Sequence, residues 1–402
     1  MQKPNTAFQR SGWIGPILEI GIRKTAILIY RRDTFQPPAE RYRWVAIPKP
    51  CQLHCFDFPA ILLHISHLKG TLCMQLHLVP RSADAFQQPV TTEQLIALCA
   101  RAFGATHPII DIHELSGGTI NTTYRVSLRD HSAVIVRVAP SDANPRLFRH
   151  ERHLLRREFF VQPFLAPIGH LLPTLYYADF THHIIARDIL IQAAIPGELW
   201  RDVQATLTQR TATALWQQLG QITYQIHRVE HRAFGPVDPV PAFHCWSDAL
   251  LMDFQNILDD MAAWCLPSQS IQRARDCLAQ HRAVFDRIQT PHLLHGDLWL
   301  NNLLIQHANT DAQIVGVLDA GFAHWGDPAA DWTMMRMSLS APSGAEAFWA
   351  GYGSVSQDAE AMPRTTIYQA RSLGWSILEL HRRQHPDCAR LWETLEAITN
   401  QL

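Results

Sequence analysis

Three oxygen-bearing side chains in the second half of the chain have the types and spacing needed to transfer a phosphoryl group. Asp297 lies in the segment HGDLWLNN (295–302), which ends with Asn302, and Asp319 follows the apolar run 314–318. Phosphoryl transfer needs an oxygen that accepts the proton of the attacking hydroxyl, and hard oxygen ligands for the Mg²⁺ that bridges the phosphates. We therefore predict Asp297 as the catalytic base and Asn302 and Asp319 as magnesium ligands.

A glycine-containing turn in the first half could contact phosphate oxygens. Residues 116–121 read SGGTIN and precede a strand-like segment. Small residues let backbone N–H groups approach phosphate closely, and side-chain hydroxyls add donors. Taken alone, the same composition also suits an ordinary turn. The candidate nucleotide contacts are Ser116, Gly117, Gly118, Thr119 and Asn121.

The elements that must position these residues follow from hydrophobic periodicity and capping signals. Thr91 or Thr92 can cap a helix that Gly104 ends. Alternating apolar and polar residues indicate strands on both sides of a polar turn near residue 130. We expect helices over 91–104 and 146–161, and strands over 122–128, 133–138, 175–178 and 183–193.

The second half has a mainly helical pattern. Apolar residues recur at alternating four- and three-residue steps between 215 and 229, as on one face of a long buried helix. Two short β-rich runs, 302–305 and 314–318, interrupt the helices. A β-rich first lobe followed by a helical second lobe is an α+β fold.

Two motifs carry a resemblance to a known family. HGDLWLNN, the segment VLDAG (317–321) and its continuation GDPAADW (326–332) resemble the catalytic loop and metal-binding Asp of the aminoglycoside phosphotransferase family. The similarity extends from about residue 95 to about residue 385. The aminoglycoside phosphotransferase family itself also resembles the choline and fructosamine kinases. The similarity implies a two-lobed protein-kinase-like fold, ATP as phosphoryl donor, Mg²⁺ as cofactor and a small-molecule hydroxyl acceptor.

The same resemblance implies roles for the first lobe. The SGGTIN turn is similar to the family's nucleotide-positioning loop, and Arg137 occupies the strand position where kinases place a phosphate-binding Lys. Glu158 is the preferred carboxylate partner of Arg137, and Glu151 is the alternative. If Glu158 is the partner, Pro163 must lie at or near the end of its helix.

The segment IQAAIPGE (191–198) resembles the hinge between kinase lobes, where the backbone meets the adenine edge. Gln192 and Ala194 are therefore candidate nucleotide contacts. His227 and His295 are expected to support the catalytic loop, and Asp331 to cap a helix or anchor that loop.

Three regions are expected along the chain. Residues 1–73 show no sustained helical or strand period and predict an N-terminal extension without a compact fold, with a small accessory domain as the alternative. Residues 74–194 would form the nucleotide-positioning N-lobe. Residues 195–402 would form the helical C-lobe, which carries the catalytic and acceptor-binding residues.

Composition limits the partners. The chain has 402 residues, of which 47% are hydrophobic and 18% charged, with a net charge of -1. This balance favours neither nucleic acid nor a membrane surface as partner. Eight scattered cysteines and no convincing targeting or spanning segment favour a cytoplasmic protein with reduced thiols. The oligomeric state cannot be inferred.

The combined interpretation is an ATP-dependent kinase acting on a hydroxyl of a small molecule of the aminoglycoside, amino alcohol, sugar or homoserine type. Gly296 stands where protein kinases carry an Arg that pairs with an activation-loop phosphate, which favours a constitutively active enzyme. The alternative is a catalytically silent nucleotide-binding or scaffold protein of the same fold.

Overall fold

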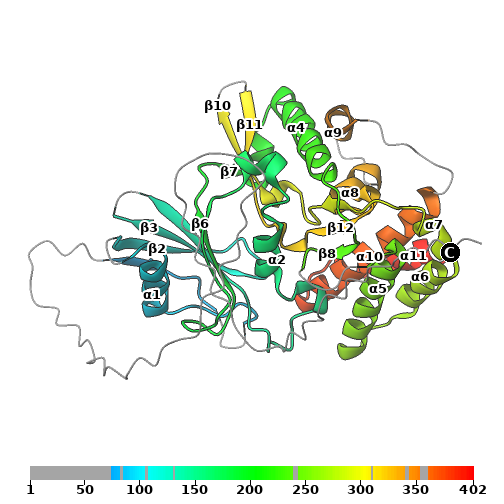
Figure 1. The fold of residues 1–402 in the computed structure, drawn as a ribbon, viewed down its shortest axis with the longest axis horizontal. Coiled ribbons are helices and arrows are strands. Elements are labelled where there is room, and N and C mark those ends of the chain that lie inside the picture. Colours follow the sequence, from blue (N-terminus) through cyan, green and yellow to red (C-terminus); the bar gives the residue numbers. More distant parts are fainter. Residues whose placement is uncertain are drawn as a thin grey trace, which may run out of the picture.

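The computed structural model describes residues 74–402 apart from 82–84, 105–106, 130–131, 239–242, 309–310, 340–343 and 354–360. A sheet lobe lies on the left of Figure 1, and a larger, mainly helical lobe lies on the right. The α+β, two-lobed arrangement predicted from the sequence is thereby confirmed. The expectation for residues 1–73 concerns a segment outside the described residues.

The first lobe is built on a six-stranded sheet with the strand order β1-β2-β3-β4-β6-β5. β1 runs parallel to β2, and all other neighbouring strands are antiparallel. The strands are β1 Gln75–His77, β2 Ile109–Leu115, β3 Thr122–Leu128, β4 Ala133–Val138, β5 Leu175–Asp179 and β6 Ile189–Ala193. Because Arg137 pairs with Thr123 in the β3–β4 ladder, it lies beside the glycine turn that joins β2 to β3.

One helix, α1 (Thr92–Phe103), covers this sheet. The Thr91 side chain accepts a hydrogen bond from the Gln94 amide, and the Gln94 side chain accepts one from Thr91 N, a reciprocal capping box that fixes the helix start. Leu95 and Leu98 are fully buried against the inward-facing residues of β3, such as Tyr124. Burial of this apolar face holds helix and sheet together.

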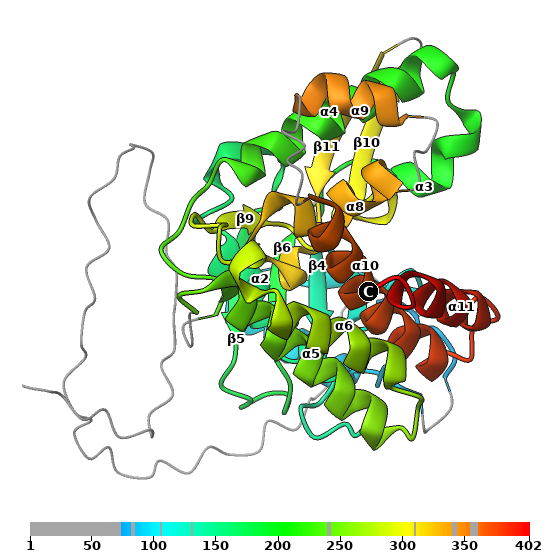
Figure 2. The same ribbon diagram turned by 90° about the vertical axis from the view of Figure 1, so that its right-hand side faces the viewer.

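The helical lobe contains two packing groups. Figure 2 shows α4 and α9 side by side next to β10 and β11, with α5, α6 and α11 grouped below them. The helices of the chain after α1 are α2 Leu154–Val161, α3 Trp200–Val203, α4 Gln209–His227, α5 Trp246–Ala263, α6 Gln269–Gln280, α7 Arg282–Phe285, α8 Trp332–Leu339, α9 Ala345–Tyr352, α10 Ala361–Arg382 and α11 Cys388–Thr399.

Two small antiparallel sheets of this lobe carry the segments predicted to be catalytic. One has the order β11-β10-β7 and the other the order β8-β12-β9. Their strands are β7 Glu198–Leu199, β8 Gly235–Pro236, β9 His292–Leu294, β10 Leu303–Ala308, β11 Asp311–Val317 and β12 His324–Gly326. The loop 295–302 therefore connects β9 to β10, and Asp319 follows the end of β11.

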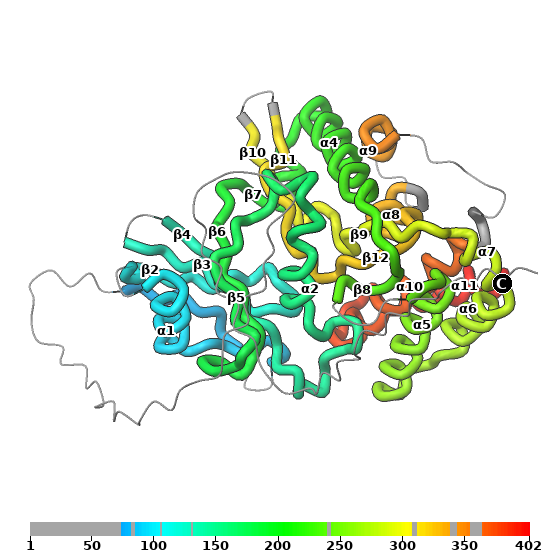
Figure 3. The backbone as a smooth tube through the Cα atoms, in the orientation of Figure 1, coloured from blue at the N-terminus to red at the C-terminus, as the bar shows by residue number. Residues whose placement is uncertain are grey.

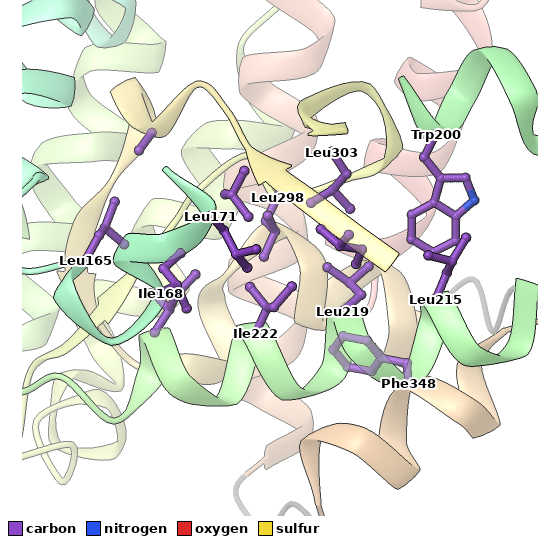
Figure 4. Packing of buried hydrophobic residues seen from close by; sticks show 14 of the residues in the cluster. Leu165, Ile168, Leu171, Trp200, Leu215, Leu219, Ile222, Leu298, Leu303 and Phe348 are labelled. Carbon is purple, nitrogen blue, oxygen red and sulfur yellow. The ribbon is translucent and has the colours of Figure 1, made fainter. Parts of the chain in front are cut away.

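Helix α2 and the turn after it join the two lobes. Figure 3 shows the chain leaving β4, passing through α2 between the lobes and returning to β5. Leu165, Ile168 and Leu171 pack against α4 residues such as Ile222, in the same cluster as Leu298 of the catalytic loop (Figure 4). The position of α2 is thus set by the core of the helical lobe.

Two expected elements differ from the structure. The helix expected over 146–161 is broken, because His153 has a φ of 59°, a left-handed conformation that interrupts a helix. A short 3-10 turn, Arg149–Glu151, precedes the break, and α2 begins after it. The strand expected over 183–193 starts only at Ile189, since the backbone turns tightly before it, with Arg187 N–H donating to the Ile185 carbonyl at 2.7 Å.

Within the described ranges, none of the helices is long and apolar enough to cross a bilayer. The described cysteines, Cys99, Cys245, Cys265, Cys277 and Cys388, are free thiols.

Candidate active site

Asp297 and Asn302 contact each other across the catalytic loop. The amide nitrogen Nδ2 of Asn302 donates to the Asp297 backbone carbonyl and to the carboxylate oxygen Oδ2, both at 2.8 Å. A 3-10 turn, Leu300–Asn302, bends the chain back so that these residues meet. Because Nδ2 is committed to Asp297, the carbonyl oxygen Oδ1 of Asn302 is the atom left to bind a cation.

Asp331 anchors this loop from below. Its carboxylate accepts hydrogen bonds from the backbone N–H of His295 at 3.1 Å and of Gly296 at 3.2 Å. His227 Nε2 lies 3.0 Å from the same carboxylate, and Asp331 is fully buried. Burial raises the pKa of Asp331, but the hydrogen bond and charge of His227 prevail and lower it to about 2.

The loop has a conformation that requires glycine at residue 296. Gly296 has a φ of 80°, in the region that side chains rarely adopt. A Cβ placed there would lie 2.3 Å from the carbonyl oxygen of Phe322. The close approach brings the segment after Asp319 directly against the catalytic loop.

Arg137 connects the sheet lobe to the metal-ligand candidate. Its Nη1 donates to Glu158 at 2.6 Å, and its Nη2 donates to Asp319 Oδ1 at 2.7 Å. Glu151, the alternative partner, instead binds Arg382, with Arg382 Nη2 at 2.7 Å from Oε1. α2 ends at Val161, two residues before Pro163, as the choice of Glu158 requires.

Asp319 occupies a strained backbone conformation. Its φ of 61° and ψ of 56° lie in the left-handed region, which a non-glycine residue adopts at a cost. The side chain is 36% exposed, whereas that of Arg137 is only 8% exposed. One face of the Asp319 carboxylate is therefore open, although Oδ1 is held by Arg137.

The electrostatics of the site raise the proton affinity of the Asp297 carboxylate. Burial and the nearby Asp319 charge raise the pKa of Asp297 well above its usual range, and the Asn302 hydrogen bond opposes them. Burial and Asp319 likewise raise the pKa of Glu158 to about 7, with Arg137 opposing. Arg137 itself stays cationic, because the two carboxylates raise its pKa more than burial lowers it.

The glycine turn is held by a side chain from outside it. Gln87 Nε2 donates to the carbonyl oxygens of Gly118 at 3.0 Å and Asn121 at 2.7 Å. Asn121 is 7% exposed, and its buried Oδ1 has no hydrogen-bond partner among the described residues. Arg201 of α3 lies across from the turn, 4.0 Å from a Cβ built on Gly117.

The other turn candidates, Ser116 and Thr119, are exposed. In the hinge candidate, Gln192 is buried in β6 and pairs with Ile135 on one side and Leu175 on the other. The backbone N–H of Ala194 donates to the Ala133 carbonyl at 3.2 Å. A nucleotide contact through Ala194 would therefore use its carbonyl oxygen, unless this sheet hydrogen bond opens.

The residues present fit Mg²⁺ bound together with phosphate. Asn302 Oδ1 and the open face of Asp319 offer two hard oxygen ligands, and Mg²⁺ usually combines one or two such side chains with phosphates and water. No group of three or more His, Cys, Asp or Glu side chains suited to a metal occurs in the described part of the chain.

Two residues near the site were missed by the sequence interpretation. Arg157 directly precedes Glu158 on α2, and the ring of His150 lies 6.0 Å from that of Phe322, centroid to centroid. Nothing in the local sequence pattern pointed to either residue.

The sequence model of the phosphotransferase enzyme family matches residues 111–367. A curated relative, "Acyl-CoA dehydrogenase family member 10" from Mus musculus, is 23% identical over 284 residues, which are 69% of this chain and 25% of that protein. The chain thus spans about a quarter of the length of this relative.

Solved structures share the fold. The GDP complex of wild-type aminoglycoside 2'-phosphotransferase-IIIa has a TM-score of 0.54 and 17% identity, covering 78% of this chain and 99% of that one. A thermostable mutant of aminoglycoside phosphotransferase APH(4)-Ia, in ternary complex with AMP-PNP and hygromycin B, has a TM-score of 0.54 and 17% identity, covering 76% and 97%. At these identities the likeness establishes a kinase-like fold.

Proposed function

Because this chain belongs to the phosphotransferase enzyme family, we propose that it transfers the γ-phosphoryl group of ATP to a hydroxyl group of a small molecule. The observation that carries the proposal is the convergence of Asp297, Asn302, Asp319 and Arg137. They come from both lobes and form two hydrogen-bonded pairs, Arg137 with Asp319 at 2.7 Å and Asn302 with Asp297 at 2.8 Å, and the charge of Asp319 acts on Asp297. Nucleotide complexes of the structural neighbours support a purine nucleotide as donor.

Each residue has a separate task in this proposal. Asp297 orients the acceptor hydroxyl and takes its proton as the oxygen attacks the γ-phosphorus and the bond to the β-phosphate breaks. Arg137 contacts the α- and β-phosphates. Asn302 and Asp319 would hold Mg²⁺, which neutralises charge on the phosphate oxygens when it is bound.

Two features favour a small acceptor over a peptide. Gly296 stands beside the catalytic base, so no arginine is present there to pair with an activation-loop phosphate. Asp331, which anchors the loop 295–302, also follows Asp319 by only twelve residues, so the segment between them offers little surface on which a peptide could bind. ATP as donor and reduced cysteines fit a cytoplasmic location, which stays a prediction.

The test is a screen for Mg²⁺-dependent ATP consumption over hydroxylated metabolites and antibiotics, repeated with GTP. We expect at least one acceptor to stimulate consumption, and chelation of Mg²⁺ to abolish it. Asp319→Asn should abolish it too, whereas Asp276→Asn, an exposed aspartate of α6 paired only with Arg275, should not.

Thermal shift with Mg²⁺ and ATP separates this proposal from the silent-scaffold alternative. Binding of the nucleotide without consumption under any acceptor would favour the nucleotide-binding scaffold. Consumption that persists in Asp319→Asn would contradict the assigned metal site.

A further inference from the structure

Tyr352, the last residue of α9, begins a series of hydrogen bonds that ends at the catalytic loop. Its hydroxyl oxygen lies 3.0 Å from Nδ1 of His227, the last residue of α4. The other ring nitrogen of His227, Nε2, lies 3.0 Å from Asp331 Oδ2. The Asp331 carboxylate also accepts the backbone N–H groups of the two residues before Asp297. Three side chains thus connect α9 to the loop that carries the proposed base.

The direction of these hydrogen bonds follows from the charge of Asp331. Although burial raises the pKa of Asp331, the hydrogen bond with His227 lowers it to about 2, so the carboxylate is ionised and can only accept. Nε2 of His227 therefore carries a proton. In the neutral imidazole Nδ1 is then an acceptor. Burial and the charge of Asp331 raise the pKa of the Tyr352 hydroxyl, which keeps its proton and can donate it to Nδ1.

Close packing of α9 on α4 sets the position of Tyr352. A Cβ placed on Gly220 of α4 would lie 2.7 Å from the backbone nitrogen of Tyr352. One placed on Gly351 of α9 would lie 2.0 Å from the carbonyl oxygen of Gln217. Figure 2 shows the two helices side by side, and Phe348 of α9 lies against α4 in Figure 4. Backbones in such contact leave little room for α9 to slide, so the Tyr352 hydroxyl is held in place.

Aromatic contacts and burial hold the two rings. The Tyr352 ring meets that of His227 edge to face at 5.6 Å, centroid to centroid, and stacks on buried Phe348 at 5.9 Å. His227 is only 4% exposed, so water cannot readily replace a lost partner of its ring nitrogens. A ring that turns to find another partner for Nδ1 withdraws its Nε2 proton from Asp331. Loss of the Tyr352 hydroxyl should therefore loosen the catalytic loop.

We propose that Tyr352 is a positioning residue for phosphoryl transfer, acting through His227 and Asp331 to hold the loop that carries Asp297. This inference rests on the proposed function and adds a residue to its machinery. Tyr352 contacts the residues that support the loop, so its role requires no contact with the nucleotide. It should therefore change the rate of the chemical step and not the binding of Mg²⁺ and ATP.

The experiment compares Tyr352→Phe with the matched control Tyr224→Phe. Tyr224 lies on α4, its ring is 5.9 Å from that of Tyr352, and it is 45% exposed. Tyr352→Phe should lower kcat about fivefold to a hundredfold, the effect of a buried acceptor left without its hydrogen bond, with an unchanged Kd for ATP in the presence of Mg²⁺. Tyr224→Phe should change neither quantity. An unchanged kcat in Tyr352→Phe, or an equal loss in both variants, would overturn the inference.

A double-mutant cycle with His227→Gln tests the route through His227. The glutamine amide can still donate to Asp331, but it has a carbon atom where the imidazole has Nδ1. Adding Tyr352→Phe to His227→Gln should therefore lower kcat by less than about twofold further. Fully additive losses would show that Tyr352 acts through packing alone, and would overturn the inference.

Hydrogen exchange gives a second readout that needs no turnover. A peptide covering residues 293–298 includes the two amides bound to Asp331. It should exchange faster in Tyr352→Phe than in wild type or Tyr224→Phe, whereas peptides from the β3–β4 hairpin should be unchanged. Unchanged exchange of the loop, or faster exchange throughout the protein, would overturn the inference.

Failure of the proposed function has a different signature. Wild type that consumes no ATP with any acceptor would remove that function, and with it the role of Tyr352 in phosphoryl transfer. A Tyr352→Phe variant as active as a working wild-type kinase would overturn only the inference about Tyr352.

Discussion

At the residue scale, the surroundings of Asp297 raise its pKa, which makes its carboxylate a better proton acceptor but lowers the stability of the folded protein at neutral pH. Its carboxylate is half-buried, near the negative Asp319, and receives a hydrogen bond from Asn302. The HGDLWLNN motif predicts Asp297 as the base, and this role stays a prediction. The raised pKa of Asp297 could not be predicted, because it depends on burial and on Asp319, which the fold brings from another strand end.

The raised pKa of Asp297 predicts a cost to folding at neutral pH. A carboxyl whose pKa is higher in the folded than in the unfolded state contributes stability below the unfolded pKa, and this is lost as pH rises through the folded pKa. Asp297→Asn removes the buried charge and should raise Tm at neutral pH by a few degrees. Calorimetry should find the gain shrinking as pH falls; an unchanged or lower Tm at neutral pH would contradict the assignment.

The same shift predicts the pH dependence of turnover. A base must be ionised to accept a proton, so kcat/KM should fall as pH drops through the raised pKa of Asp297. The acid limb should therefore lie above the ordinary aspartate value of 3.8. A pH profile at saturating Mg²⁺ measures it, and a rate that is flat down to that value would exclude the raised pKa.

At the element scale, local patterns predicted the elements that depend on local sequence. β3 and β4 match the expected ranges 122–128 and 133–138, and α1 is capped by Thr91, one of the two residues expected to cap it. Pairings between distant segments had no local signal. The two-residue β7 gains its structure by pairing with β10, more than a hundred residues later, and could not be found from sequence periodicity.

The catalytic loop gives a test at this scale through two glycines with positive φ. Gly296 has a φ of 80° and a Cβ there would lie 2.3 Å from Phe322 O, whereas Gly353 has a φ of 101° with nothing within 4 Å. Gly353→Ala should cost about 1 kcal/mol of backbone strain. Gly296→Ala should destabilise clearly more and also lower kcat, because the loop and the segment after Asp319 must separate.

Thermal unfolding and steady-state kinetics of the two variants measure this difference. Equal destabilisation by both substitutions would mean that backbone strain alone lowers the stability of the variants and that the contact with Phe322 contributes nothing.

At the scale of the whole molecule, Arg137 and α2 couple the lobes. Arg137 extends from the sheet to Asp319 of the helical lobe, and residues 165–171 after α2 are buried in the core of that lobe. The sequence predicted both lobes. It could not predict that residues 148–171 contribute to the helical cores, since their apolar side chains carry no mark of which partner they bury against.

The sequence of residues 1–73 shows no sustained helical or strand period. We therefore expect a protein beginning at Met74 to keep the Tm and turnover of the full chain. Parallel calorimetry and activity measurements would check this; an unfolded or inactive shortened protein would show that residues 1–73 are required.

The most direct test of the central claim is turnover by Asp297→Ala at saturating Mg²⁺ and ATP, with nucleotide binding measured on the same sample. Loss of a positioned general base predicts a rate lower by about a hundredfold to ten-thousandfold, with ATP still bound through Arg137, Asn302 and Asp319. Turnover equal to wild type would show that Asp297 is not the base and that the assigned active site is wrong.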